Sequence, residues 1–231
     1  MGPGCAFASG FAHLAGRIES TDLMLTLEAD NTSRLELVST MLRRLDEGHD
    51  VVLASPYMYG GGIVQTTPVR IFLSYIANAV LKEFLSLHGI LTVSSFFRIY
   101  RGDAVKRLHA SYGPPIVERA GFECMVEMLM KMAYLRLTIS EVPMVLDTSR
   151  RVGKSKMRVM RTGIGYLALF RARSRWRALA AIDERHGPAD VPVLEEIDEI
   201  DEQHRPAAVH VLDEIDERRQ PAAVHAPLRG D

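Results

Sequence analysis

Apolar and polar positions follow two different periods along most of the chain. In four segments the apolar residues recur every three or four positions, which predicts helices. These segments are residues 5–17, 34–48, 68–87 and 122–134. Short apolar or alternating runs, which are typical of strands, lie between and after them. These runs are residues 22–30, 50–55, 94–101 and 137–146.

The alternation of helix-like and strand-like segments predicts an α/β fold, with a parallel or mixed sheet covered by helices. The expected order begins with a helix, whereas a doubly wound nucleotide-binding domain opens with a strand and a glycine-rich loop. Glycines occur at positions 2, 4 and 10, but no apolar run precedes them and they form no complete GxGxxG sequence. We therefore expect a sheet that lacks the first strands of such a domain.

Residues from Ile182 onward form a repetitive acidic tail. Three versions of one unit occur at 182–196, 200–214 and 215–227, and each has a proline near its centre. Proline ends a helix, and the repeats hold few large apolar residues to offset the entropy of ordering. The sequence thus predicts a domain at 1–181 and a mostly disordered tail at 182–231. The tail either stays solvated, folds back on a basic segment or binds a partner.

The net charge of -1 conceals a strong division of charge along the 231 residues. Acidic residues outnumber basic ones 14 to 5 after residue 181, whereas no acidic residue occurs between Thr148 and Ala181. The basic residues of that acid-free segment are Arg150, Arg151, Lys154, Lys156, Arg158, Arg161, Arg171, Arg173, Arg175 and Arg177. A block of this kind indicates binding to phosphate groups or to an anionic surface.

Other features of the composition exclude several classes of protein. Cys5 and Cys124 are too few for a disulfide framework, and we find no pattern of a secretory signal sequence. The longest apolar stretch, residues 71–91, contains Lys82 and Glu83, which argues against a transmembrane helix. We expect a cytoplasmic protein.

Two carboxylates follow the first predicted strand. Glu28 and Asp30 stand two residues apart at its carboxyl end, where α/β folds bind their ligands. One carboxylate there suits a divalent cation and the other suits a sugar or ribose hydroxyl. The alternative is a structural role, in which Asp30 or Asn31 starts a turn or caps the helix that begins near Arg34.

Basic and polar residues form two further candidate sites. A basic loop follows the last predicted strand, and a close backbone turn at Gly153 with several cations beside it suits phosphate oxygens. The loop comprises Arg150, Arg151, Gly153, Lys154, Ser155 and Lys156. Arg70, Ser74 and Asn78 fall at four-residue steps on one helix face, which either binds an anion or is an ordinary polar face.

Five segments, taken in order, resemble one family of enzymes. They are TLEADNTS, GHDVVLASPYMYGGG, RIFLSYIAN, SSFFRIYR and GFECMVEMLMKMAYLRLTISEVPMVLDTSRRVGKSKMRVMRT. Over residues 4–170 the chain resembles the family 2 glycosyltransferases of the polyprenyl-phosphate (dolichol-phosphate) mannosyltransferase type. Five motifs in the family's order make this resemblance more specific than any single motif.

The resemblance implies a glycosyltransferase A-type fold and an inverting transfer of mannose or another hexose from a nucleotide sugar to a polyprenyl or dolichyl phosphate. Mg²⁺ or Mn²⁺ is the expected cofactor. Glu28 and Asp30 match the family's acidic Asp-x-Asp motif, which implies donor binding by both and metal binding by Asp30. Arg70 and Ser74 match positions that line the acceptor phosphate. The loop that closes over the phosphates matches Arg150, Gly153, Ser155 and Lys156, and Asp30 and Arg150 are the implied catalytic residues.

The chain also departs from this family. Glu28 replaces the usual first aspartate, and Pro56 stands where the family has arginine. The family's opening strand, with its Pro-x-x-Asn-Glu sequence, has no counterpart. We therefore expect an N-terminally truncated glycosyltransferase. The alternative is an inactive remnant that acts as a basic membrane-binding or interaction module.

The last helix-like segment, residues 157–181, bears on where the protein acts. Its predicted apolar face consists of Met160, Ile164, Leu167 and Phe170, with arginines at its ends and flanks. This helix either covers the core or lies on anionic lipid with Trp176 among the headgroups. We expect salt-sensitive peripheral binding to the cytoplasmic face of a membrane. No nucleic acid partner is expected, because no reading motif or aromatic array accompanies the charge.

Overall fold

The computed structural model of the chain describes residues 2–30, 32–85, 87, 89–150 and 159–186. The helices are α1 (Pro3–Ala15), α2 (Val38–Asp46), α3 (Pro68–Leu85), α4 (Gly102–Tyr112), α5 (Cys124–Tyr134) and α6 (Val159–His186). The strands are β1 (Leu23–Thr26), β2 (Val51–Ser55), β3 (Gly62–Val64), β4 (Arg98–Arg101), β5 (Ile139–Pro143) and β6 (Val145–Asp147). Two short 3₁₀ helices are η1 (Leu35–Leu37) and η2 (Thr148–Arg150).

The main sheet is mixed. Its four strands lie in the order β1-β4-β2-β5, with β4 antiparallel to both β1 and β2, and with β2 parallel to β5. A second, two-stranded sheet pairs β3 in parallel with β6. The predicted α/β fold with a mixed sheet and covering helices is therefore confirmed. β1 is an edge strand of this sheet within the described residues.

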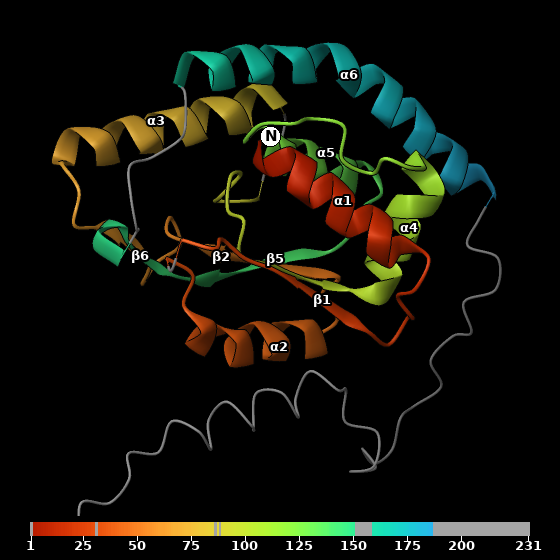
Figure 1. Cartoon of the computed structure of the whole chain (residues 1–231), viewed down its shortest axis with the longest axis horizontal. Helices are drawn as coiled ribbons and strands as arrows, with labels where there is room; N and C mark the ends of the chain where they lie inside the picture. Colours follow the sequence, from red (N-terminus) through yellow and green to blue (C-terminus); the bar gives the residue numbers. More distant parts are fainter. Residues whose placement is uncertain (1, 31, 86, 88, 151–158, 187–231) are drawn as a thin grey trace, which may run out of the picture. The chain divides into compact units, whose positions relative to one another are not determined.

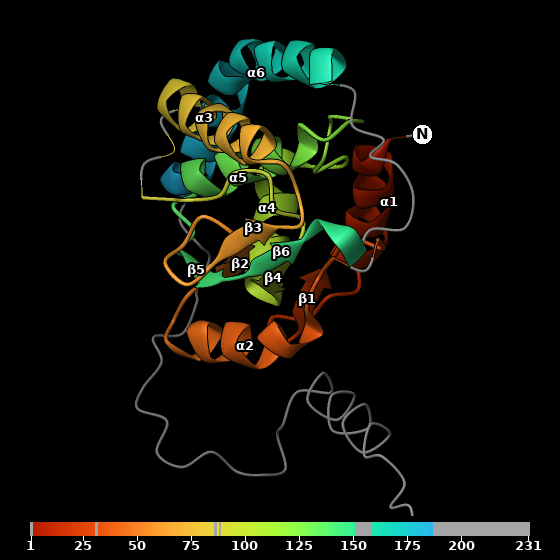
Figure 2. The ribbon, with the colours of Figure 1, turned by 90° about the vertical axis from the view of Figure 1, so that its left-hand side faces the viewer.

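Helices cover both faces of the main sheet (Figure 1). α2 lies below the sheet in this view, whereas α1, α4 and α5 lie above it, and α3 and α6 form a further layer beyond α5. The same layers are seen from the side in Figure 2. The sheet is thus enclosed between helices, which explains why every residue of β2 is buried.

The core between the sheet and the upper helices is filled mainly from α5. Its buried methionines are Met125, Met128, Met130 and Met132. Thioether side chains adapt to irregular gaps between neighbours, which suits this position under several helices. α4, which the sequence analysis did not assign, adds Ala104, Val105 and Leu108 to the same core.

The buried residues of α6 are not those of the predicted apolar face, although Phe170 of that face packs partly buried against the core. The residues buried on α6 are Leu169, Ala172, Trp176 and Ala180, at spacings typical of one helix face. Leu167 belongs to the predicted apolar face, yet it is 66% exposed. The placement of Trp176 among lipid headgroups is wrong, because this side chain is fully buried. The alternative, a helix that covers the core, is confirmed.

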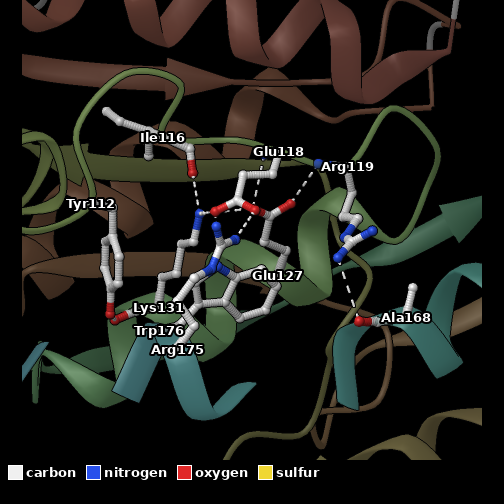
Figure 3. A network of polar contacts seen from close by, with 9 residues as sticks. All are labelled: Tyr112, Ile116, Glu118, Arg119, Glu127, Lys131, Ala168, Arg175 and Trp176. Carbon is white, nitrogen blue, oxygen red and sulfur yellow. Dashed lines mark hydrogen bonds and ion pairs between the residues drawn. The ribbon is translucent and has the colours of Figure 1, made fainter. Parts of the chain in front are cut away.

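A buried ion-pair network fastens α6 to α5 (Figure 3). Lys131 of α5 is fully buried, and its Nζ donates to Glu127 Oε1 at 2.8 Å and to Glu118 Oε1 at 3.2 Å. Trp176 Nε1 of α6 donates to the same Glu118 oxygen at 2.9 Å. Arg175 pairs with the second oxygen of Glu118. Glu118 therefore links both helices through one carboxylate.

The network also fixes the loop that precedes α5. The Glu127 carboxylate accepts the backbone N–H groups of Glu118 at 2.9 Å and Arg119 at 2.8 Å. Burial by itself raises the pKa of Glu118, but the hydrogen bond from Trp176 and the charge of Lys131 outweigh it and hold the pKa below its usual value. Glu118 is thus ionised at neutral pH.

The predicted boundary between the domain and the tail falls within the last helix. α6 continues to His186, beyond residue 181 where the sequence analysis placed the boundary. The acidic repeats from residue 187 onward lie outside the described residues, and so does the predicted disorder of that tail.

Candidate functional site

Three strands end at the same edge of the main sheet. Because β1 and β2 are both antiparallel to β4, and β5 is parallel to β2, these three strands share one direction. Ligands of α/β sheets bind at such carboxyl ends. Glu28 and Asp30 follow β1, Tyr57 follows β2, and Arg150 follows β5 through β6 and η2. The topology thus directs three of the predicted segments to one edge.

Two carboxylates converge on one hydroxyl after β1. Thr32 is buried, and its Oγ1 lies 2.5 Å from Asp30 Oδ1 and 3.0 Å from Glu28 Oε2. A threonine hydroxyl has a single proton, so it donates to one of these carboxylates at a time. Asp30 Oδ1 also accepts the backbone N–H of Thr32 at 3.1 Å. The turn predicted as a structural role for Asp30 is therefore present, together with a cluster of acceptors.

The donor chemistry of this cluster fits a hard divalent cation. Carboxylate and hydroxyl oxygens are ligands that Mg²⁺ and Mn²⁺ prefer. Mg²⁺ in particular binds one or two carboxylates and completes its shell with water and substrate phosphates. The described part of the chain contains no group of three or more His, Cys, Asp or Glu that could hold a metal. A cation at this edge would therefore need other ligands beside Glu28 and Asp30, such as water and the phosphates of a bound substrate.

Two hydroxyl groups meet where the residues after β2 face α3. Tyr57 Oη and Ser74 Oγ lie 2.7 Å apart, and the Tyr57 ring packs edge-on against Tyr75 with 4.8 Å between the ring centres. Burial raises the pKa of the Tyr57 phenol, although its bond to Ser74 opposes this rise. The phenol is therefore neutral at physiological pH, and it holds the Ser74 hydroxyl in one position.

A side-chain bond ties η2 to the segment before α3. Thr148 Oγ1 donates to the carbonyl oxygens of Val64 at 3.2 Å and Gln65 at 2.6 Å. η2 contains Arg150, and the segment after Gln65 leads into α3 with Arg70 in its first turn. The Thr148 side chain therefore links the segment that contains Arg150 to the segment that leads to Arg70.

The structure describes the predicted phosphate-binding residues only in part. Arg70 lies in α3 and Arg150 in η2, but the burial of their side chains is not described. Gly153, Ser155 and Lys156 lie outside the described residues. Their assignment to the acceptor phosphate stays a prediction.

Asn78 has a structural role. It is 7% exposed, its amide nitrogen donates to the carbonyl oxygen of Leu91, and its amide oxygen accepts the backbone N–H of Val93 at 3.1 Å. Both ends of the amide hold the segment before β4. Asn78 is therefore not available to a ligand beside Ser74.

Two residues of this edge were missed by the sequence analysis. Thr32 stands two positions after Asp30, and a hydroxyl residue at this distance from an aspartate is a common element of turns, which could have indicated it. Tyr57 follows a fully buried strand, and its position at the ligand-binding edge could have done the same. The contact of Tyr57 with Ser74 spans 17 residues and has no sequence pattern.

Comparisons with known proteins agree with the sequence motifs. No protein-family model matches the chain. The chain is 26% identical over 156 residues to polyprenol monophosphomannose synthase of Mycolicibacterium smegmatis, in an alignment that covers 68% of this chain and 56% of that protein. The resemblance to this class of mannosyltransferase is confirmed. The chain thus spans little more than half the length of this relative.

Solved structures of one other enzyme are also similar. Glucosyl-3-phosphoglycerate synthase of Mycobacterium tuberculosis in complex with phosphoglyceric acid gives a TM-score of 0.44 at 16% identity, covering 78% of this chain and 55% of that chain. The same enzyme in complex with Mn²⁺ and uridine-diphosphate-glucose gives a TM-score of 0.43 at 19% identity, covering 76% of this chain and 54% of that chain.

Proposed function

We propose that this chain carries the catalytic portion of an A-type glycosyltransferase. It would transfer a hexose, with inversion, from a nucleotide sugar to the phosphate of a polyprenyl or dolichyl lipid. The observation that carries the proposal is the convergence of Glu28 and Asp30 on Thr32 at the edge where β1, β2 and β5 end. The 26% identity to polyprenol monophosphomannose synthase supports mannose as the sugar and a polyprenyl phosphate as the acceptor.

The donor side of the proposed reaction lies after β1. Mg²⁺ or Mn²⁺, when bound, supplies positive charge that stabilises the diphosphate leaving group. Asp30 is the proposed metal ligand, and Glu28 beside it is the proposed second contact to the donor. The Thr32 hydroxyl donates to one of these carboxylates at a time, and the Thr32 backbone N–H also holds Asp30, so the two carboxylates already lie close together before the sugar donor binds.

The acceptor side of the proposed reaction lies between η2 and α3. A phosphate acceptor is already an anion, so the displacement requires alignment and neutralisation of charge more than a general base. Arg70 and Arg150 are proposed to neutralise this phosphate, and Ser74, held by Tyr57, to donate a hydrogen bond to it. The proposed loop over the phosphates is completed by Gly153, Ser155 and Lys156.

A lipid acceptor places the reaction at a membrane surface, so we assign the chain to the cytoplasmic face of a membrane as a peripheral protein. None of the helices in the described residues is long and apolar enough to cross a bilayer. The exposed arginines of α6 support attraction to anionic lipid. No nucleic acid is proposed as a partner.

Substitution of Asp30 tests the proposed donor site. Asp30→Asn keeps an oxygen acceptor for Thr32 but removes the negative charge, so the turn persists while the metal-dependent reaction is lost. We expect transfer of labelled hexose to polyprenyl phosphate in the presence of Mn²⁺ to fall about a hundredfold or more. The matched control is Glu19→Gln, because Glu19 is an exposed acid beyond the opposite end of β1. Wild-type turnover by Asp30→Asn at saturating donor would contradict the metal role.

A further inference from the structure

α3 exposes a continuous row of apolar side chains. Val69, Phe72, Leu73, Ile76 and Val80 recur at spacings of three, one, three and four residues, and we call them the α3 outer face. Each of these residues is between 44% and 67% exposed. Single exposed apolar residues are common, but a contiguous row on one helix marks an interaction surface.

The opposite side of α3 attaches the helix to the body. Ser74 bonds to Tyr57, Asn78 bonds to the segment before β4, and Leu85 is buried in the core. A surface helix of a soluble domain normally turns polar residues outward, whereas α3 has apolar residues on its outer side as well. The outer face is therefore not needed to hold α3 in place.

The charges around the α3 outer face decide which partner fits it. No acidic residue occurs between Asp50 and Glu83, so the whole helix up to Lys82 is free of negative charge. Tyr59, in the loop between β2 and β3, is 99% exposed. A helix that lies in the interface of an anionic bilayer typically combines aromatic and apolar side chains with basic residues and contains few acids.

α6 lies on the same side of the sheet as α3. Both helices occupy the layer opposite α2 in the two views of the molecule (Figures 1 and 2). Arg171, Arg173 and Arg177 are exposed on α6, while Arg175 is paired with Glu118. An anionic surface that approaches the molecule from this side of the sheet would therefore meet the helix that carries these exposed arginines.

We propose that the α3 outer face inserts, parallel to the membrane plane, into the interfacial region of an anionic bilayer, and that the α6 arginines assist it by attraction to lipid phosphates. This proposal rests on the proposed function in one respect: membrane binding would bring the enzyme to its lipid acceptor. The binding itself does not require sugar transfer. Apolar insertion, rather than the arginines alone, then determines the strength of binding. Binding consequently has a component that salt does not remove.

Liposome sedimentation tests the proposal with the whole chain. The vesicles contain equal parts of phosphatidylcholine and phosphatidylglycerol, and binding is measured at low salt and at about 1 M salt, where the screening length is about 3 Å. We expect the variant Phe72→Gln/Leu73→Gln/Ile76→Gln to bind the vesicles at least about tenfold more weakly than the wild type, because it no longer transfers three apolar side chains out of water. The wild type should keep part of its binding at high salt.

A matched variant controls for the general loss of surface apolarity. Leu25→Gln/Leu35→Gln changes two exposed leucines near β1, on residues that are 38% and 47% exposed, and should bind vesicles as the wild type does. Circular dichroism verifies that each variant is folded. Wild-type vesicle binding by the folded α3 variant would overturn the proposal, and so would a complete loss of wild-type binding at high salt.

A second measurement does not depend on removing the outer face. Phe72→Trp places an indole on it, whereas the native Trp176 is fully buried. We expect vesicles of brominated lipid to quench the new fluorescence, and absence of quenching in vesicle-bound protein would overturn the proposal. A dimer that the triple variant abolishes, with vesicle binding unchanged, would assign the face to a second copy instead. None of these measurements uses a sugar donor, so their outcome is separate from that of the transfer assay.

Discussion

Replacing Lys131 with methionine removes the central cation of the network that joins α5 to α6. The ammonium is fully buried and donates to Glu127 Oε1, to Glu118 Oε1 and to the carbonyl oxygen of Ile116, the last at 2.6 Å. Methionine has a similar length but no charge or donor. The substitution therefore leaves the fully buried Glu127 carboxylate without its counter-ion while the packing volume is nearly kept (Figure 3).

The expected loss follows from the burial of the pair. Removing one partner of a buried ion pair costs about 3–5 kcal/mol, because the remaining charge stays uncompensated. Glu118 is 26% exposed and keeps Trp176 and Arg175, so it adds little to this loss. We expect a decrease of about 3 kcal/mol in the free energy of unfolding, measured by urea denaturation, and a melting temperature lower by about 10 °C.

Two further variants make the result specific. Lys106→Met is the same chemical change at a lysine of α4 whose bond to Ser20 is exposed, and it should alter the free energy of unfolding by less than about 0.5 kcal/mol. The double variant Lys131→Met/Glu127→Gln leaves no unpaired charge and should be more stable than Lys131→Met alone. A loss below about 1 kcal/mol for Lys131→Met, or a double variant that is less stable than the single one, would refute the argument.

Two more predictions concern stability. Because the pKa of Glu118 is lowered in the folded protein, its ionised form adds stability that is complete above its ordinary pKa of 4.5 and is lost as the pH falls through the folded value. Urea denaturation across the acid range should therefore show a smaller acid-induced loss for Glu118→Gln than for the wild type, and an equal loss would contradict the assignment. Asn78→Ala leaves the carbonyl of Leu91 and the N–H of Val93 without their partner and should lower the free energy of unfolding by about 2 kcal/mol. An unchanged denaturation midpoint would show that this amide does not hold the segment before β4.

The sequence predicted most elements because their local patterns are strong. The predicted run 50–55 is apolar from Val51 to Ala54 and became β2, in which every residue is buried, and the helical spacing in 122–134 became α5. The order of the strands could not be predicted in this way. β4 lies between β1 and β2 in the sheet although it is distant from both in the sequence, and no local pattern specifies this pairing. The run 137–146 was predicted as one strand but became two strands in different sheets, which its local pattern did not indicate.

Errors occurred where a distant partner decides the role of a side chain. The predicted apolar face of α6 included Leu167, which is exposed, whereas Trp176 is buried and donates its indole N–H to the distant Glu118. The sequence analysis assigned no role to Lys131, which stands among methionines and is held inside by two carboxylates. Of the candidate site, Glu28 and Asp30 were predictable from their place after a strand, whereas their convergence on Thr32 depends on the turn that follows.

The most direct test of the proposed function is formation of lipid-linked sugar by the purified chain. Labelled nucleotide hexoses, among them the mannose donor, are incubated with polyprenyl phosphate vesicles and Mn²⁺, and the extracted lipid is counted. The proposal predicts labelled lipid with Mn²⁺ or Mg²⁺ and only background after chelation of the metal. Folded, vesicle-bound protein that forms no labelled lipid from any of these donors would contradict it and favour a binding module without transferase activity.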